Sequence, residues 1–143
     1  MIKRFVCSGL AMLGMASAAA SAAEIHALQG TPASLMAQYA QQAGVPVSAL
    51  SAPRGAALYR TEHPGRNGQA VSCAGCHTAN PTQAGRTRVG KRIEPLAPAA
   101  NPQRFTDAAK AEKWFRRNCQ DVLQRECSAQ EKGDFIAWLS QAR

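Results

Sequence analysis

The sequence predicts a small all-α domain, and three observations lead to that fold class. Helix-starting and helix-ending residues punctuate four stretches, whereas no stretch alternates apolar and polar residues, as a strand would, for more than a few positions. After an N-terminal leader, described next, about 120 residues remain, enough for one domain with one core. Residues 78–103 include four prolines and two glycines. A loop this long is unusual unless it wraps around something.

Residues 1–23 have the composition of a secretory signal peptide. Two basic residues precede an apolar run that ends near Ala20, and small residues follow it. The run is shorter and richer in small residues than the roughly 20 apolar residues of a membrane span. We therefore expect cleavage after Ala22 or Ala23, export to the periplasm, and a mature domain of residues 24–143 without a transmembrane segment.

Two helices are predicted in the first part of the mature chain. Thr31 is a capping residue, Pro32 suits the first helical position, and Gly44 suits the position past the end. A second, shorter helix is expected over residues 52–60. Gly55 in that helix would let another helix approach closely.

Two further helices are predicted near the C-terminus. Thr106 is the expected cap of a helix over residues 107–118. Ser128 and Glu131 form a capping-box pattern that opens a last helix running to about Gln141. That last helix carries an apolar stripe at helical spacing, which we expect to pack against the helix at 52–60.

The charge of the chain excludes some partners and favours others. The formal charge is +8, and removal of the two basic residues of the leader leaves +6. Such a charge suits docking to an acidic redox partner or to a membrane surface. We do not expect nucleic-acid binding, because the basic residues form no run interleaved with aromatic residues and the chain is predicted to be exported.

The motif that organises the chain is Cys73-Ala74-Gly75-Cys76-His77. Its C-x-x-C-H pattern is typical of covalent attachment of a c-type haem. The two thiols bond to the haem vinyl groups, and the histidine becomes the proximal iron ligand. A thioredoxin-like pair would need a βαβ pattern, and a zinc site would need two further ligands at suitable spacing. Neither is evident, so we expect one covalent haem c with its iron.

The other cysteines fit an oxidising compartment. Cys7 lies in the leader, which leaves Cys119 and Cys127 as an even pair in an exported protein. A disulfide between them is therefore expected.

The sixth iron ligand is not evident from the sequence. An electron-carrying cytochrome c usually has a methionine or a second histidine there, but neither residue type follows His77. His26 and Met36 precede the motif, on the wrong side for the usual topology, and His63 lies in a predicted surface turn. The lysines at 91, 110 and 113 could bind iron only if burial lowered the pKa of the side chain from its ordinary value of about 10.4. Otherwise the position is open or held by a weak neutral group.

One such group is Asn118. With Ala111, Trp114 and Phe115 it falls on one face of the helix predicted at 107–118, and this face would direct an amide into the core. Asparagine is also common at the C-terminal end of a helix. Spacing alone does not decide between a ligand and a helix-end residue.

Several segments of the chain resemble the asparagine-ligated monohaem cytochromes c of the sphaeroides haem protein type. The resemblance covers about residues 55–138, and its discriminating feature is Arg117-Asn118-Cys119 followed by a second cysteine. The matching segments are residues 90–98, 101–107, 113–119, 125–127 and 130–132.

The resemblance implies a class I-like cytochrome c domain whose iron is held by His77 and, when oxidised, by Asn118. It also implies that Asn118 leaves on reduction, so that oxygen, nitric oxide or carbon monoxide can bind, and that Cys119 pairs with Cys127. An amide oxygen is a hard, weak donor that suits ferric better than ferrous iron. The implied electron donor is a dihaem cytochrome c; a membrane cytochrome is the other partner considered.

Two other functions stay open at this point. One is an ordinary electron-transfer cytochrome c with a stable sixth ligand. The other is an enzyme that oxidises nitric oxide. The sequence shows no distal histidine for the acid–base pair that peroxide chemistry uses, so we expect a redox and gas-binding protein rather than an enzyme.

Overall fold

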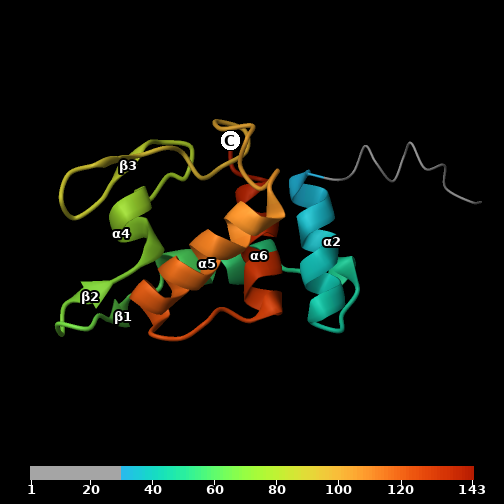
Figure 1. Cartoon of the computed structure of the whole chain (residues 1–143), viewed down its shortest axis with the longest axis horizontal. Coiled ribbons are helices and arrows are strands. Elements are labelled where there is room, and N and C mark those ends of the chain that lie inside the picture. The colour runs from blue at the N-terminus through green and yellow to red at the C-terminus, as the bar shows by residue number, and fades with distance from the viewer. Residues whose placement is uncertain (1–29) are drawn as a thin grey trace, which may run out of the picture.

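The computed structural model describes residues 30–143, and in them helices dominate. Figure 1 shows α5 crossing the middle of the molecule, α2 at one end, and α4 with two small hairpins at the other. The predicted leader, residues 1–23, lies outside the described residues. Within residues 30–143, none of the helices combines the length and the apolar character that crossing a membrane requires. The helices are α2 (Pro32–Gln42), η1 (Val47–Ala49, a 3₁₀ turn), α3 (Ala52–Arg60), α4 (Cys73–His77), α5 (Ala108–Leu123) and α6 (Ala129–Leu139).

Three of the predicted helices begin where the sequence predicts. Thr31 caps α2 in a capping box with Ser34, and Pro32 occupies the first turn. Ser128 caps α6 in the predicted capping box with Glu131. The helix expected at 52–60 is α3, which runs over those residues and is capped by Ser51.

The prediction for α5 was wrong at both ends. Asp107, not Thr106, is its cap, because the Asp107 carboxylate accepts a hydrogen bond from the backbone N–H of Lys110 at 2.9 Å. The Thr106 hydroxyl instead donates to the Gln103 carbonyl. The helix also continues past Asn118 to Leu123, and Gln124 then ends it in a left-handed conformation. Asn118 is therefore an interior residue of α5 and not a helix-end residue.

Two hairpins of two-residue strands interrupt the helical architecture. In the first, β1 (His63–Pro64) pairs antiparallel with β2 (Ala70–Val71), which leads directly into α4. In the second, β3 (Gly85–Arg86) pairs with β4 (Arg92–Ile93). Both lie in segments that the sequence predicts as irregular, since strands this short leave no measurable alternation.

The core lies between α2, α3, α5 and α6. The predicted contact of α6 with α3 is confirmed at Gly55, where a Cβ atom would lie 2.0 Å from the Asp134 carbonyl oxygen. The core residues include four that are almost completely buried and a row of aromatic rings in contact. The four are Tyr39, Tyr59, Ile136 and Leu139, and the contacting rings are Tyr39, Tyr59, Phe105, Phe115, Phe135 and Trp138.

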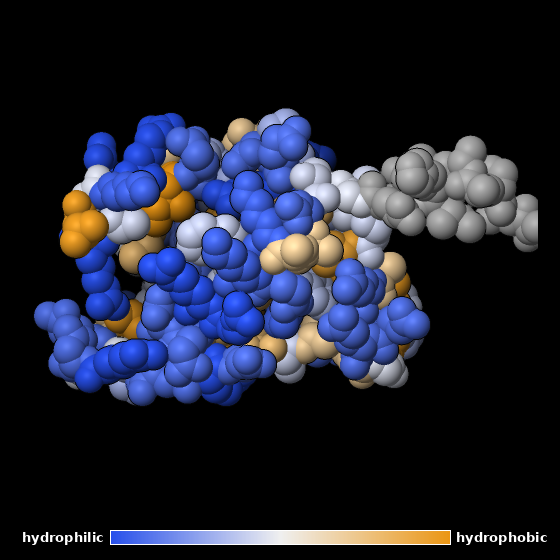
Figure 2. Space-filling model, in the orientation of Figure 1, coloured by the Kyte–Doolittle hydropathy of each residue, from blue (hydrophilic) through white to orange (hydrophobic). Residues whose placement is uncertain are grey.

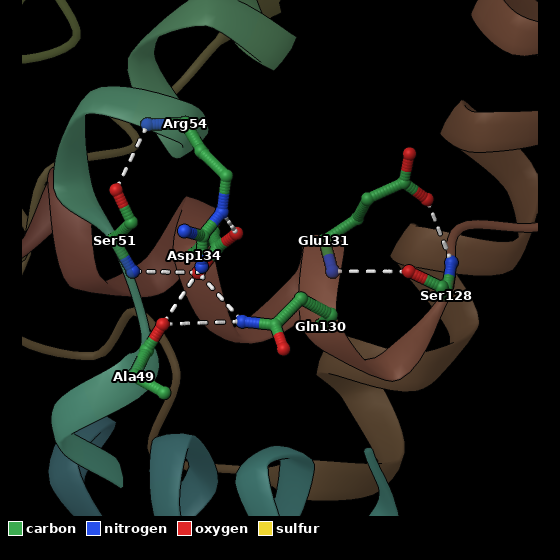
Figure 3. Close-up of polar contacts among 7 residues, drawn as sticks. All are labelled: Ala49, Ser51, Arg54, Ser128, Gln130, Glu131 and Asp134. Atoms are coloured by element: carbon green, nitrogen blue, oxygen red, sulfur yellow. Dashed lines mark hydrogen bonds and ion pairs between the residues drawn. The ribbon is translucent and has the colours of Figure 1, made fainter. Parts of the chain in front are cut away.

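A buried carboxylate fixes the start of α3 on α6. Asp134 is 3% exposed and accepts hydrogen bonds from the Ser51 backbone N–H at 2.6 Å and from the Arg54 Nε at 2.7 Å. The amide of Gln130 donates to it as well, at 3.1 Å, and Figure 3 shows these groups converging from the two helices. Because the charge is paired and its oxygens are hydrogen-bonded, its burial is compatible with stability.

Candidate functional site

Helix α4 consists of the five residues of the predicted attachment motif. Ser72 caps it, with its hydroxyl oxygen accepting a hydrogen bond from the Gly75 backbone N–H at 3.2 Å. Cys73 and Cys76 are three residues apart and therefore lie on one face of one helical turn. Both are free thiols and half-buried, and burial raises the pKa of the Cys73 thiol to about 11. Two unpaired thiols on one turn fit the two thioether bonds of haem c.

His77 ends α4 and is suited to bind a metal through a neutral imidazole. Burial, and secondarily the nearby charge of Arg104, lowers the pKa of His77 to about 4. The next residue, Thr78, has a φ of 68°, which is rare for a residue with a side chain. Its carbonyl oxygen accepts a hydrogen bond of 2.5 Å from the hydroxyl of Tyr59, which is completely buried. Helix α3 therefore fixes the chain directly behind the histidine, a role for Tyr59 that the sequence did not reveal.

The long segment after α4 packs back onto it. A Cβ atom on Gly85 would lie 2.0 Å from the Cys76 carbonyl oxygen and 2.9 Å from the His77 Cα, so β3 touches the backbone of the motif. The Pro81 carbonyl accepts hydrogen bonds from two later backbone N–H groups. Arg104 donates to the carbonyls of Glu94 and Pro95. The segment thus packs on α4 at Gly85, and the expectation that it wraps around a bound group stays a prediction.

Asn118 does not point into a packed core, contrary to our expectation from its face of the helix. The buried residues of α5 are Ala111, Phe115 and Cys119, whereas Trp114 is 40% exposed and Asn118 is also exposed. At about 100° per residue, seven residues place Asn118 only about 20° around the helix from Ala111. The buried positions of α5 are four residues apart, so each lies about 40° further around the helix than the one before. By Cys119 the buried stripe has turned away from Asn118, which is therefore exposed.

The surface is hollowed on this side of the molecule. Figure 2 shows the hollow between the lobe that carries α4 with the β3 loop and the body formed by α5, with β1 and β2 at its lower edge. The attachment helix on one side and helix α5 on the other are suitable walls for a flat group. The residues present therefore fit a covalently bound haem.

His63 is less exposed than we expected. It is half-buried in β1, and its Nε2 atom is buried with no hydrogen-bond partner among the described residues. Strand β1 contacts α5, and the Gln124 side chain donates to the Pro64 carbonyl at 2.5 Å. A buried nitrogen without a partner is costly, so His63 fits a site that another group completes.

The other candidates for the sixth ligand are placed less favourably. Met36 packs against the core cluster from α2. Lys91, Lys110 and Lys113 are all exposed. His26 lies outside the described residues.

The cysteines next to Asn118 have disulfide geometry. The Sγ atoms of Cys119 and Cys127 are 1.99 Å apart and their Cα atoms 5.6 Å apart. This contact joins the C-terminal half of α5 to the residue before the cap of α6. The bond at Cys119, the next residue in the chain, thereby constrains the position of Asn118 on α5.

The protein side chains alone do not form a metal centre in the described part of the chain. Residues 30–143 contain no group of three or more His, Cys, Asp or Glu side chains placed to hold a metal ion.

Comparison with known proteins leads to c-type cytochromes. Residues 46–139 match a family described as a domain of unknown function, DUF1924. The cytochrome c-type protein SHP of Cereibacter sphaeroides is 48% identical over 110 residues, which are 77% of this chain and 83% of SHP. Cytochrome c″ of Methylophilus methylotrophus is 49% identical over 74 residues, which are 51% of each chain.

Solved structures have the same fold. Oxidised SHP, described as an oxygen-binding cytochrome c, superposes with a TM-score of 0.70 at 48% identity, over 76% of this chain and 95% of its own. Oxidised cytochrome c″ gives a TM-score of 0.71 at 36% identity, over 78% and 94%. A solution structure of cytochrome c″, concerned with haem-ligand detachment, gives 0.65 at 37% identity, over 77% and 92%.

Proposed function

Because this chain belongs to the DUF1924 family and is a c-type cytochrome of the kind that includes SHP, we propose that it is a periplasmic redox protein whose reduced haem binds a small diatomic gas. It carries covalently bound haem c with iron. Haem c supplies an iron that accepts one electron and takes a further ligand when an axial position is open.

The residues of α4 would hold the cofactor. Cys73 and Cys76 would form the two thioether bonds, and His77 would bind the iron from the proximal side. The neutral imidazole of His77 and the two free thiols support this assignment. The hydrogen bond from Tyr59 to the residue after His77 would limit the orientations open to the ring.

Asn118 is the proposed distal ligand of the oxidised protein. Its amide oxygen would bind ferric iron weakly and leave when the iron is reduced. The observation that carries this proposal is an exposed amide beside the buried stripe of α5, in a chain with no methionine or histidine after His77. The study of ligand detachment in cytochrome c″, a relative of this chain, supports the idea that a distal ligand can be released.

The neighbouring disulfide would restrict this movement. A bond between Cys119 and Cys127 holds the backbone next to Asn118, so the ligand would leave by a change of side-chain rotamer or a small shift of α5 rather than by unfolding of the helix. A disulfide and covalent haem both suit the periplasm, to which the predicted leader would direct the chain. The electrons would come from a dihaem cytochrome c or a membrane cytochrome.

The test of gas binding is the optical spectrum of the reduced holoprotein with and without carbon monoxide. We expect a high-spin ferrous spectrum that carbon monoxide changes. A low-spin spectrum that the gas leaves unchanged would instead establish an ordinary electron carrier with a stable sixth ligand.

The ligand itself is tested by Asn118→Ala, with Gln120→Ala as the matched control. Gln120 is an exposed amide on the same helix, two residues away. We expect Asn118→Ala to alter the oxidised spectrum and to leave carbon monoxide binding by the reduced protein intact, whereas Gln120→Ala changes neither. If the oxidised spectrum of Asn118→Ala were that of the parent, Asn118 would not be the ligand.

A further inference from the structure

The β3–β4 hairpin concentrates positive charge on one exposed loop beside the haem-attachment helix. Its residues 86–92 include four cations and no acidic residue, and all four are exposed. Part of this charge is offset by Glu94, whose carboxylate lies 2.9 Å from the Arg92 Nε, a pair that is itself exposed. The four cations are Arg86, Arg88, Lys91 and Arg92.

The arrangement of these charges is unfavourable for the hairpin itself. Arg86 and Arg92 are direct partners across the two strands, and like charges in that position destabilise a strand pair. The turn is nevertheless well ordered by its own hydrogen bonds: the Thr87 N–H donates to the Lys91 carbonyl at 2.8 Å, and the Lys91 N–H donates to the Thr87 hydroxyl at 3.0 Å. Local features that reduce stability are expected at functional sites.

An apolar residue projects from the middle of this charged loop. Val89 is 90% exposed, the most exposed of the large hydrophobic residues in the described chain. A small apolar centre with a charged rim is the composition of a small protein interface. Brief electron-transfer contacts typically use interfaces of this limited size.

The base of the hairpin is in contact with the haem-binding segment. Gly85, the first residue of β3, packs against the backbone of Cys76 and His77. A protein that docks on the hairpin would therefore lie close to the group that α4 holds, as electron transfer requires.

We propose that the β3–β4 hairpin is the docking surface for an acidic redox protein, with Val89 at the centre of the contact and the four cations steering the approach. This inference rests on the proposed function only in so far as the chain exchanges electrons. It does not depend on Asn118 or on gas binding. Attraction between opposite charges acts mainly on the rate of encounter, and salt screens it over about 10 Å at 0.1 M ionic strength.

The experiment measures how fast a chosen acidic donor reduces the ferric holoprotein. Reduced flavodoxin, an acidic protein that gives up one electron to the iron, is mixed with the parent and with Arg88→Glu/Lys91→Glu in a stopped-flow instrument. The matched control is Lys110→Glu/Lys113→Glu, which makes the same change of net charge on exposed positions of α5. Hexaammineruthenium(II), a small cation that needs no docking surface, shows whether the haem itself is unchanged.

We expect the hairpin variant to lower the second-order rate with flavodoxin at least tenfold at low ionic strength, and the control variant to lower it less than threefold. The difference should shrink as salt is added, and the rate with the small cation should stay within twofold of the parent. Val89→Ser should lower the flavodoxin rate at low and at high salt alike.

Two results would overturn the proposal. Equal rate losses in the hairpin and control variants would show that net charge matters and the hairpin does not. The second result would be that the parent binds vesicles containing phosphatidylserine, the hairpin variant does not, and the flavodoxin rate is unchanged. This result would assign the surface to a membrane. Failure of gas binding would affect neither readout, so the two proposals are tested separately.

Discussion

Replacing Gly55 by alanine tests whether the close approach of α3 to α6 positions the haem-binding segment. The added Cβ would lie 2.0 Å from the Asp134 carbonyl oxygen, a shortfall of 1.4 Å from the 3.4 Å of ordinary contact. The neighbouring atoms are helix backbone, so the two helices must separate. Overpacking of this kind costs about 3 kcal/mol at the upper end, and the better helix propensity of alanine returns about 1 kcal/mol. We expect a net loss of about 2 kcal/mol, which corresponds to roughly 8 °C in Tm for a domain of this size.

The matched control is Gly133→Ala on α6. Its Cβ would meet the side chain of Leu50, with the nearest atom at 2.7 Å, and that side chain can rotate away. The gain in helix propensity is the same, so we expect a stability within about 1 kcal/mol of the parent. The measurement is thermal unfolding of both oxidised holoproteins followed by circular dichroism. Equal Tm values for the two variants would refute the argument that backbone contact at Gly55 sets the packing of α3.

The same helix contact should be visible at the haem. Tyr59 lies four residues after Gly55 on α3 and hydrogen-bonds the residue that follows His77. Displacement of α3 in Gly55→Ala should therefore change the Soret spectrum or the reduction potential, and Gly133→Ala should change neither. A Gly55→Ala protein with lowered Tm and an unaltered haem would show that the two effects are not linked.

Three further predictions concern the hydrogen bond at the motif, the disulfide and the behaviour in acid. Tyr59→Phe leaves the Thr78 carbonyl without its hydrogen-bond donor. We expect the free energy of unfolding in urea to fall by about 1 kcal/mol and the reduction potential to shift. An unchanged potential would contradict the positioning role of Tyr59. Replacing Cys119 and Cys127 together by serine should lower the free energy of unfolding by about 2.5 kcal/mol, because the bond closes a loop of about nine residues. Equal stability of the parent with and without reductant would argue against a disulfide. The pKa of Glu131 lies below its ordinary value, chiefly because the Glu131 carboxylate accepts a hydrogen bond from Arg125. The stability that the ionised carboxylate contributes is therefore complete above about pH 4.5 and is lost as the pH falls through the lower pKa of the folded protein. Glu131→Gln should lose less stability than the parent between about pH 5 and 3, and parallel stability curves would refute this.

The sequence predicted those parts of the fold that depend on local chemistry. The caps at Thr31 and Ser128 and the helix at 52–60 depend on residues within a few positions of one another, so their patterns were sufficient. The close contact at Gly55 was also foreseeable, since a glycine inside a helix suggests a neighbour at short distance. The all-α class followed from the same local signals.

The remaining features depend on contacts between distant parts of the chain. The continuation of α5 beyond Asn118 depends on packing of Leu123 and on the contact of Gln124 with β1. The burial of the His63 Nε2 atom depends on how that hairpin lies against α5. The exposure of Asn118 depends on how the buried stripe of α5 turns around the helix from Ala111 to Cys119, which the packing of the neighbouring elements decides.

The contact of Gly85 with the backbone of Cys76 and His77 has a consequence for biogenesis. Once the segment after α4 has closed onto it, both thiols are half-buried and one side of the motif is covered by backbone. A bulky porphyrin and the enzyme that delivers it need the motif while this side is still free. We therefore expect the chain to acquire its cofactor as an open polypeptide, with the closure of β3 onto α4 as the last stage of its maturation.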